Sequence, residues 1–176
     1  MPATAETGRP PILGLVQRRD QTDQDAPAAH VSLEVLENVR TATIKPMIAA
    51  KVKGGAQCFT DTYNIYHCTK ADYDHRTVNH GAGGYARHDP DGTCVHCTTM
   101  EGIWSGLRHC LDHFQGISQR FLHLRVGRYE FLHNHTHLHW HQTFETALRY
   151  MFSTTGEYWR QRPHQHRRMP LTLCYQ

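Results

Sequence analysis

Short apolar runs separated by polar turns dominate the first half of the chain, a pattern typical of strands. We predict a buried strand over residues 11–18 and a half-buried strand over residues 28–36, where apolar and polar residues alternate. The polar run 20–25 between them indicates a hairpin. Two further strands are predicted over residues 56–61 and 76–80, and the first of these ends in a carboxylate.

Helical spacing of apolar residues marks the remaining segments. It predicts one helix over residues 41–52 and three later helices around residues 98–111, 121–132 and 144–151. Residues 81–94 are rich in Gly, Asp and Pro and predict a loop. This order of elements predicts an α/β fold, in which helices cover a sheet and the C-terminal part is helical.

Length and composition indicate one folded domain with polar ends. The chain has 176 residues, of which 39% are hydrophobic, and its mean hydropathy is -0.63. We expect a disordered lead-in over residues 1–10, the folded domain over residues 11–155 and a basic, His-rich, solvated tail over residues 156–176. No window of 18 apolar residues and no signal peptide are visible, so we expect neither a membrane span nor secretion.

Charge and cysteine content restrict the partners. The formal net charge of +3 permits nucleic acid as a partner without requiring it, and 16 histidines make the charge depend on pH. Six cysteines without a secretory signal favour reduced thiols or a metal site over disulfides. We therefore expect a cytoplasmic protein.

Two carboxylates are candidates for chemistry. Asp61 ends the predicted strand 56–61, and Glu101 lies in the first turn of the helix that begins near Thr98. Arg108 follows on the same helical face, about 10 Å further along the axis. Two-metal phosphoryl transfer uses carboxylates of this kind. The structural alternative is that Asp61 caps the next helix and Glu101 complements the helix dipole.

Five runs of the chain carry a resemblance to a known family. The runs are Arg9–Arg18 (RPPILGLVQR), Phe59–Tyr66 (FTDTYNIY), Thr77–Arg87 (TVNHGAGGYAR), His96–His109 (HCTTMEGIWSGLRH) and Arg128–Asn134 (RYEFLHN). In order and spacing they are similar to motifs of insertion-sequence DDE transposases of the ISXO-like type, over roughly Pro10 to Phe152.

The resemblance implies an RNase H-like mixed sheet flanked by helices. It makes Asp61 the second catalytic acid and Glu101 the third, both binding Mg²⁺ or Mn²⁺, and it puts Arg108 where the family usually has a DNA-positioning Lys. Arg87 and His80, in the third run, are expected to contact DNA. The implied partner is the DNA of transposon ends, with a possible homo-oligomer, in a bacterial protein that is associated with the nucleoid when it is bound to DNA.

The chain also departs from the family. The family's first Asp lies on a strand that precedes the Pro-Ile-Leu-Gly-Leu-Val run, whereas only eleven residues precede Ile12 here, with Glu6 as their sole acid. The zinc-ribbon region is absent, and Thr98 replaces the family's Asn. Losing one ligand of a two-metal site removes most activity. We therefore expect a truncated, inactive transposase remnant that lacks the first, central strand of the sheet.

Cysteine and histidine patterns leave an alternative open. Cys94, Cys97, His109 and His113 form a C-x2-C-x11-H-x3-H pattern, which Zn²⁺ binds tetrahedrally in zinc fingers, but the finger's small apolar core is missing. Histidines also recur at every second position from 133 to 141, and on one helix they would divide between two faces. The pattern permits a His/Cys-rich zinc-binding protein.

A second alternative is a DNA-binding module without catalysis. It would use the same surface, with Arg87 and Arg108 on phosphates, together with four arginines of the predicted tail. These are Arg160, Arg162, Arg167 and Arg168.

Overall fold

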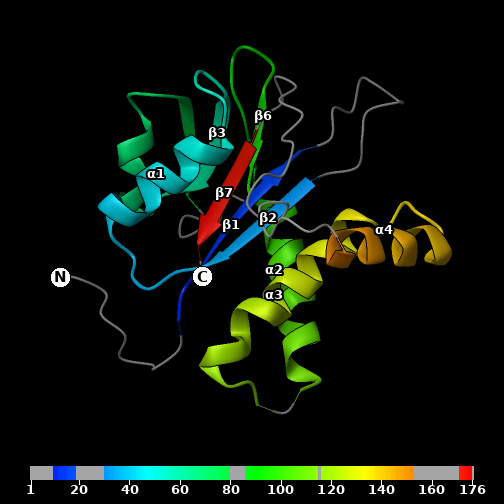
Figure 1. The fold of residues 1–176 in the computed structure, drawn as a ribbon. Helices are drawn as coiled ribbons and strands as arrows, with labels where there is room; N and C mark the ends of the chain where they lie inside the picture. Colours follow the sequence, from blue (N-terminus) through cyan, green and yellow to red (C-terminus); the bar gives the residue numbers. More distant parts are fainter. Residues whose placement is uncertain (1–9, 19–29, 80–85, 115, 153–170, 176) are drawn as a thin grey trace.

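A computed structural model describes residues 10–18, 30–79, 86–114, 116–152 and 171–175. Its strands are β1 (Ile12–Gln17), β2 (His30–Val35), β3 (Gln57–Asp61), β4 (Asp74–Val78), β5 (Ala86–His88), β6 (Cys94–His96) and β7 (Leu171–Tyr175). Its helices are α1 (Thr41–Lys51), the 3-10 helix η1 (Asn64–Thr69), α2 (Thr98–Asp112), α3 (Gln119–Asn134) and α4 (Trp140–Phe152). Figure 1 shows the mixed sheet with helices on both sides, which confirms the predicted α/β class.

The main sheet has five strands in the order β2-β1-β7-β3-β4. β1 pairs antiparallel with β2 and with β7, whereas β3 pairs parallel with β7 and with β4. The predicted strands 11–18, 28–36 and 56–61 are confirmed, and the first two form the expected antiparallel pair. The polar run 20–25 between them lies outside the described residues.

Two predicted boundaries differ from the structure. β4 begins at Asp74, two residues before the predicted start of its strand. The predicted loop 81–94 contains an antiparallel pair, β5 with β6, in its described part. Arg76 of β4 holds the turn between these strands, because its Nη1 lies 3.0 Å from Asp89 and 2.7 Å from Asp91. Charge pairing, which the composition of this segment did not reveal, thus organises the hairpin.

The central strand β7 comes from a segment for which no strand was expected. Residues 171–175 belong to the predicted solvated tail 156–176, yet they pair with β1 on one side and β3 on the other. Only Thr172 and Tyr175 in this segment are of types that are enriched in strands. Two strand edges that would otherwise lack partners give this segment its place. The arginines 160–168 of the predicted tail lie outside the described residues.

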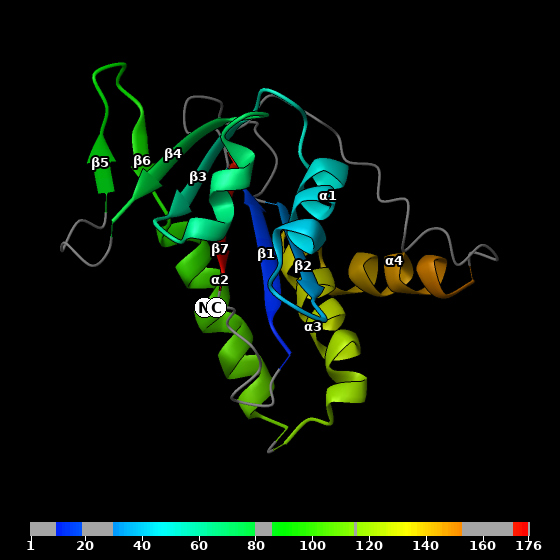
Figure 2. The ribbon, with the colours of Figure 1, turned by 90° about the vertical axis from the view of Figure 1, so that its left-hand side faces the viewer.

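Helices cover both faces of the sheet, as Figure 2 shows. Successive residues of β1 point to opposite faces, so Leu15 packs into a cluster with α1, and Val16 packs into a cluster with α2 and α3. Gly14 lies under α2, where a Cβ atom would come within 2.2 Å of Met100 and 2.7 Å of Trp104. The absence of a side chain at Gly14 therefore lets α2 lie close to the sheet.

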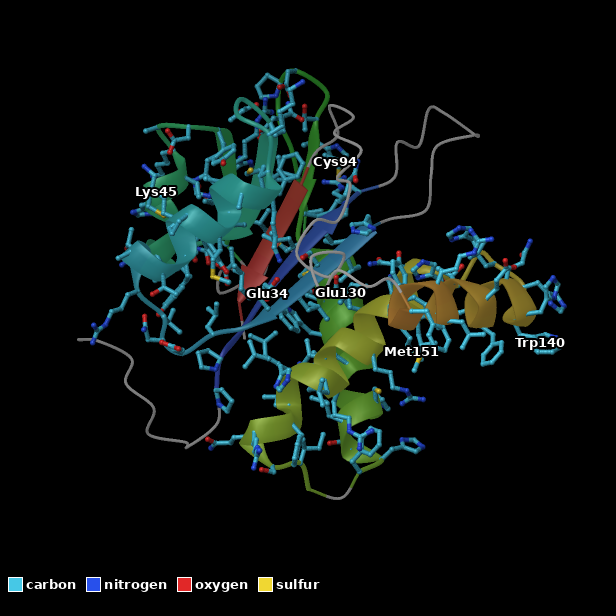
Figure 3. The ribbon with its side chains drawn as sticks, in the orientation of Figure 1. Glu34, Lys45, Cys94, Glu130, Trp140 and Met151 are labelled. Atoms are coloured by element: carbon cyan, nitrogen blue, oxygen red, sulfur yellow. The ribbon has the colours of Figure 1, made fainter. Side chains whose placement is uncertain are left out.

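The predicted later helices are confirmed as α2, α3 and α4, but the histidine tract is not one helix. α3 ends at Asn134, and α4 begins only at Trp140. Histidines 133 to 141 therefore do not share one helix, and a division between two faces of a single helix does not apply to them. A new helix start explains the break, because the backbone N–H of His139 donates to Oε1 of Gln142 (3.0 Å), as in a capping box. Figure 3 shows α4 projecting away from the sheet.

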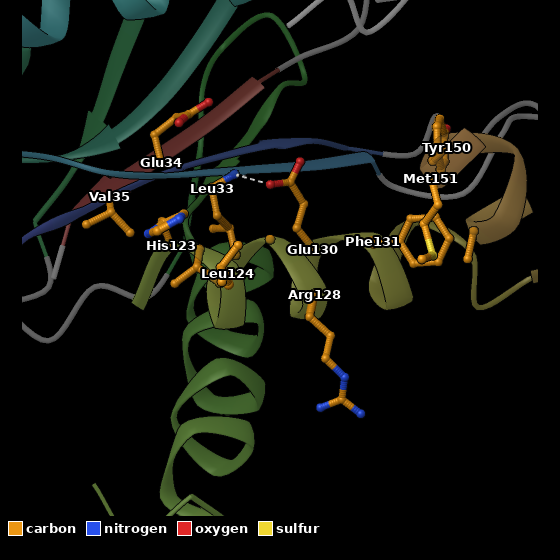
Figure 4. Close-up of a pocket in the computed structure, with 13 residues that line it drawn as sticks. Leu33, Glu34, Val35, His123, Leu124, Arg128, Glu130, Phe131, Tyr150 and Met151 are labelled. Carbon is orange, nitrogen blue, oxygen red and sulfur yellow. Dashed lines mark hydrogen bonds between the residues drawn. The ribbon is translucent and has the colours of Figure 1, made fainter. Parts of the chain in front are cut away.

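α3 closes the outer edge of β2 with two side chains. Asn134 accepts a hydrogen bond from the N–H of Val31 and donates one to its carbonyl, both at 2.8 Å. Glu130, which is buried, accepts from the N–H of Leu33 at 3.2 Å (Figure 4). An exposed strand edge invites pairing with other chains. Here the side chains of α3 take the place of a neighbouring strand.

Candidate functional site

Asp61 ends β3 and is half-buried. Its Oδ1 accepts a hydrogen bond from the N–H of Tyr63 (3.1 Å), so the carboxylate shapes the turn that leads into η1. Asp61 thus acts on the start of η1 much as a helix cap does, which is the structural alternative that the sequence left open for this residue. The preceding residue is also held, because the hydroxyl of Thr60 lies 2.7 Å from Nε2 of His75 and donates to the carbonyl of Asp61.

His75 was not singled out by the sequence. Burial, and after it the charges of Lys70 and His67, lower the pKa of His75. Its Nδ1 is buried and has no hydrogen-bond partner among the residues that the structure describes. A neutral imidazole beside Thr60 therefore supports the backbone next to Asp61. The sequence signal was weak, because nothing in the sequence distinguishes His75 among the 16 histidines of the chain.

Glu101 lies in the first turn of α2 and is exposed. The start of α2 is fixed by the short strand before it, because Val95 of β6 forms a core cluster with Phe59 of β3 and Val78 of β4. Asp61 follows Phe59 by two residues, and Glu101 follows Val95 by six. The fold thus brings the two segments that carry these acids to one region of the sheet, and Figure 2 shows α2 starting where β6 ends.

Arg18 joins three elements in the same region. Its Nη1 donates to the carbonyl of Cys94 (3.2 Å), and its guanidinium lies 4.9 Å from the ring centre of Phe59. Burial lowers the pKa of Arg18, although an arginine stays charged at neutral pH. Burial, and secondarily Arg18, lower the pKa of His96. Arg18 was overlooked, and the available signal was its place as the last residue of the run Arg9–Arg18.

The basic residues proposed for DNA differ in their surroundings. Arg108 is exposed on α2, on the same solvent-facing side of the helix as Glu101. Arg87 is exposed and donates to Asp89 (2.7 Å) and to the carbonyl of Thr77 (3.0 Å). Its charge therefore also holds β5 to β4. His80 lies outside the described residues.

The four zinc candidates are not brought together. Cys97 is buried at the N-terminal end of α2, beside Cys94 of β6. His109 and His113 are exposed at the other end of the helix, where each ring Nδ1 lies near the carbonyl four residues before it. The helix separates Cys97 from His109 by about 18 Å.

The described ranges hold no metal centre. No group of three or more His, Cys, Asp or Glu side chains there is placed to bind a metal ion. A two-metal site needs several carboxylates around both cations. The central strand β7 supplies none, because residues 171–175 are Leu-Thr-Leu-Cys-Tyr. Asp61 and Glu101 alone therefore do not fit the pair of Mg²⁺ or Mn²⁺ ions that the resemblance implies.

Within the described part of the chain, no helix is long and apolar enough to cross a membrane.

Two comparisons show that the chain is similar to transposases. The family model of the ISXO2-like transposase domain matches residues 2–134. A Haemophilus influenzae protein called an uncharacterized transposase-like protein is 25% identical over 105 residues, which are 59% of this chain and 80% of that protein. No solved structure matches. Because the family model covers well over half of the chain, this protein belongs to the ISXO2-like transposase family.

Proposed function

We propose that this protein binds DNA at the ends of a transposable element and that this chain alone does not cut the DNA. Membership of the transposase family supports the DNA partner. The proposal that this chain alone does not cut DNA rests on which segment of the chain forms the central strand. β7 occupies the middle of the sheet and contains no carboxylate, so Asp61 and Glu101 have no third acid beside them there.

The strand arrangement supports an RNase H-like sheet. β1 and β2 form an antiparallel pair, β3 and β4 form a parallel pair, and a central strand joins them. The resemblance puts the family's first catalytic acid on that central strand. In this chain the C-terminal segment β7 takes the position instead, antiparallel to β1 and parallel to β3.

The surface available for DNA is the solvent-facing side of α2 and the neighbouring hairpin β5–β6. Arg108 offers an exposed guanidinium, which binds a backbone phosphate as a planar pair of donors. Arg87 adds a second charge, held in place by Asp89. Arg18, half-buried beside β6, adds a positive potential beneath this surface. Phosphate contacts of this kind give affinity without sequence preference.

DNA binding is tested by titrating labelled duplex DNA at several salt concentrations. We expect binding that weakens with salt, and we expect Arg108→Ala to lower the slope of log affinity against log salt by about 0.9, the loss of one phosphate contact. Arg128→Ala is the matched control, since this exposed arginine of α3 points away from the sheet (Figure 4). An equal effect of both variants would contradict a site on α2.

Strand cutting is tested separately with supercoiled DNA in Mg²⁺ and in Mn²⁺. We expect no nicking above background by the wild-type chain, because the residues that the structure describes hold no group of three or more side chains placed to bind a metal ion. Nicking that Asp61→Asn or Glu101→Gln abolishes would show that this chain does assemble an active site, and would overturn this half of the proposal.

A further inference from the structure

Two residues of the histidine tract 133–141 meet at the start of α4. Nδ1 of His139 lies 2.7 Å from Nδ1 of His141, and the two ring centres are 4.6 Å apart with their planes inclined by 46°. Both side chains are exposed, so dissolved ions can reach the pair. The two imidazoles thus present converging nitrogen atoms to solvent.

The break between α3 and α4 makes this meeting possible. Residues two positions apart in a helix point to different sides and do not face each other. His139, however, precedes the first residue of α4, whereas His141 lies in the first turn. The backbone N–H of His139 donates to Oε1 of Gln142 (3.0 Å), and its carbonyl accepts from the N–H of Thr143 (3.1 Å). Because the backbone of His139 makes these bonds, its imidazole can turn towards His141 while the helix start stays capped.

The separation of the two nitrogens suits two ligands of one cation. With metal–nitrogen bonds of about 2.0–2.1 Å, ligands at adjacent corners of a square or an octahedron lie about 2.8–3.0 Å apart, and those of a tetrahedron lie about 3.3–3.4 Å apart. The 2.7 Å between His139 and His141 is nearer to the first of these separations. Imidazole ligands in square-planar or octahedral geometry are typical of Cu²⁺ and Ni²⁺.

We propose that His139 and His141 bind one divalent transition-metal cation of this class through their Nδ1 atoms. Solvent completes the coordination, because no third His, Cys, Asp or Glu among the described residues is placed to join the pair. Without the cation, one neutral ring donates its Nδ1–H to the other. On binding, that proton leaves to solvent and Nε2 of the same ring takes up another, so both imidazoles stay neutral. This proposal does not rest on the proposed function.

Trp140 gives the pair an optical reporter. Its ring centre lies 6.0 Å from that of His139 and 5.9 Å from that of His141. Figure 3 shows Trp140 at the end of α4 that lies away from the sheet. A cation with unpaired d electrons, such as Ni²⁺, quenches the fluorescence of an indole this close to it. Trp104 is buried on α2, so its emission supplies a background that the site should not change.

Titration of the full-length chain with Ni²⁺, followed by tryptophan fluorescence, tests the site. Ni²⁺ serves as the probe because Cu²⁺ would oxidise the free thiols of the chain. Every variant carries Trp159→Phe, so that Trp140 and Trp104 are the remaining indoles. We expect saturable quenching with one ion per chain, and we expect excess Mg²⁺ not to compete, because Mg²⁺ takes oxygen ligands. Trp140→Phe should remove the quenching. Absence of saturable quenching while Trp140 is present would overturn the proposal.

Replacing single histidines separates the pair from the rest of the tract. His139→Ala and His141→Ala should each weaken Ni²⁺ binding at least about tenfold, because the second metal–nitrogen bond then no longer forms within the same molecule. His137→Ala is the matched control, since this exposed histidine belongs to the tract but lies outside the pair, and it should leave the midpoint of the titration unchanged. An equal loss in all three variants, or no loss in His139→Ala, would overturn the assignment to this pair.

Discussion

Asn134 is the residue whose replacement tests the described fold most directly. Asn134→Ala removes two hydrogen bonds to Val31 and leaves its buried N–H and carbonyl without partners, at a cost of about 1–2 kcal/mol for each group. We expect the free energy of unfolding to fall by about 2–4 kcal/mol. Domains of this size have only about 5–15 kcal/mol in total, so the loss is large.

Urea unfolding followed by circular dichroism measures this loss. With a slope of about 2 kcal/mol per molar urea, the midpoint should fall by about 1–2 M. Asn134→Asp keeps the acceptor for the Val31 N–H but turns a carboxylate oxygen towards the Val31 carbonyl, so it should also destabilise at neutral pH. Arg128→Ala, an exposed change on the same helix, should stay within about 0.5 kcal/mol.

A loss below about 0.5 kcal/mol for Asn134→Ala would refute the reasoning, because it would mean that water replaces the side chain at no cost. A freed β2 edge also predicts association, which light scattering detects as a growth in particle size with protein concentration. Glu130 holds the next N–H along the same edge, so the strand should remain partly protected in the single variant.

Three further outcomes follow from the same structure. Gly14→Ala should lower the free energy of unfolding by about 1–3 kcal/mol, because the added methyl meets the rigid ring of Trp104. Gly127→Ala should raise the free energy of unfolding by up to about 1 kcal/mol, because the added methyl lies in open space on α3 and alanine favours a helix. Urea titration of both variants measures the two changes. Burial lowers the pKa of His75, His96 and His133 below their value of about 6.5 in the unfolded chain. The unfolded chain therefore binds protons first, so stability should be complete above about pH 6.5 and fall as the pH drops through the folded pKa values. Urea midpoints at pH 7.5 and pH 5.5 measure it, with His133→Gln showing a smaller fall; equal midpoints would contradict this. Burial raises the pKa of Cys58 to about 12, so this thiol should stay unmodified when the native protein is treated with a disulfide reagent, as peptide mapping reports.

Much of the fold was predictable because it depends on local patterns. Alternating or continuous apolar runs defined β1, β2 and β3, and helical spacing defined α1 and the stripe of α2 that includes Met100 and Trp104. The sequence patterns failed to predict the elements whose formation depends on contacts between distant residues or on a single side chain. The β5–β6 hairpin depends on Arg76 reaching carboxylates on another segment, and the histidine tract is divided by a helix start whose cap is a single Gln side chain.

The candidate site was predictable in its parts but not in its assembly. Asp61 and Glu101 could be named from position and motif, and the structure places them at the end of β3 and the start of α2. Arg18 and His75 could not be named from pattern, since their significance lies in contacts with Phe59, Cys94 and Thr60 across the sheet. The proposed contacts of Arg108 with DNA stay a prediction.

The sequence by itself determined the family, the α/β class, the antiparallel pair β1–β2 and the presence of the strands β3 and β4. These follow from motifs and periodicities that neighbouring residues carry. Only the tertiary structure decided what lies between β1 and β3. A five-residue segment at the far end of the chain has no distinctive pattern of its own, and it becomes a central strand because two edges elsewhere offer it backbone partners.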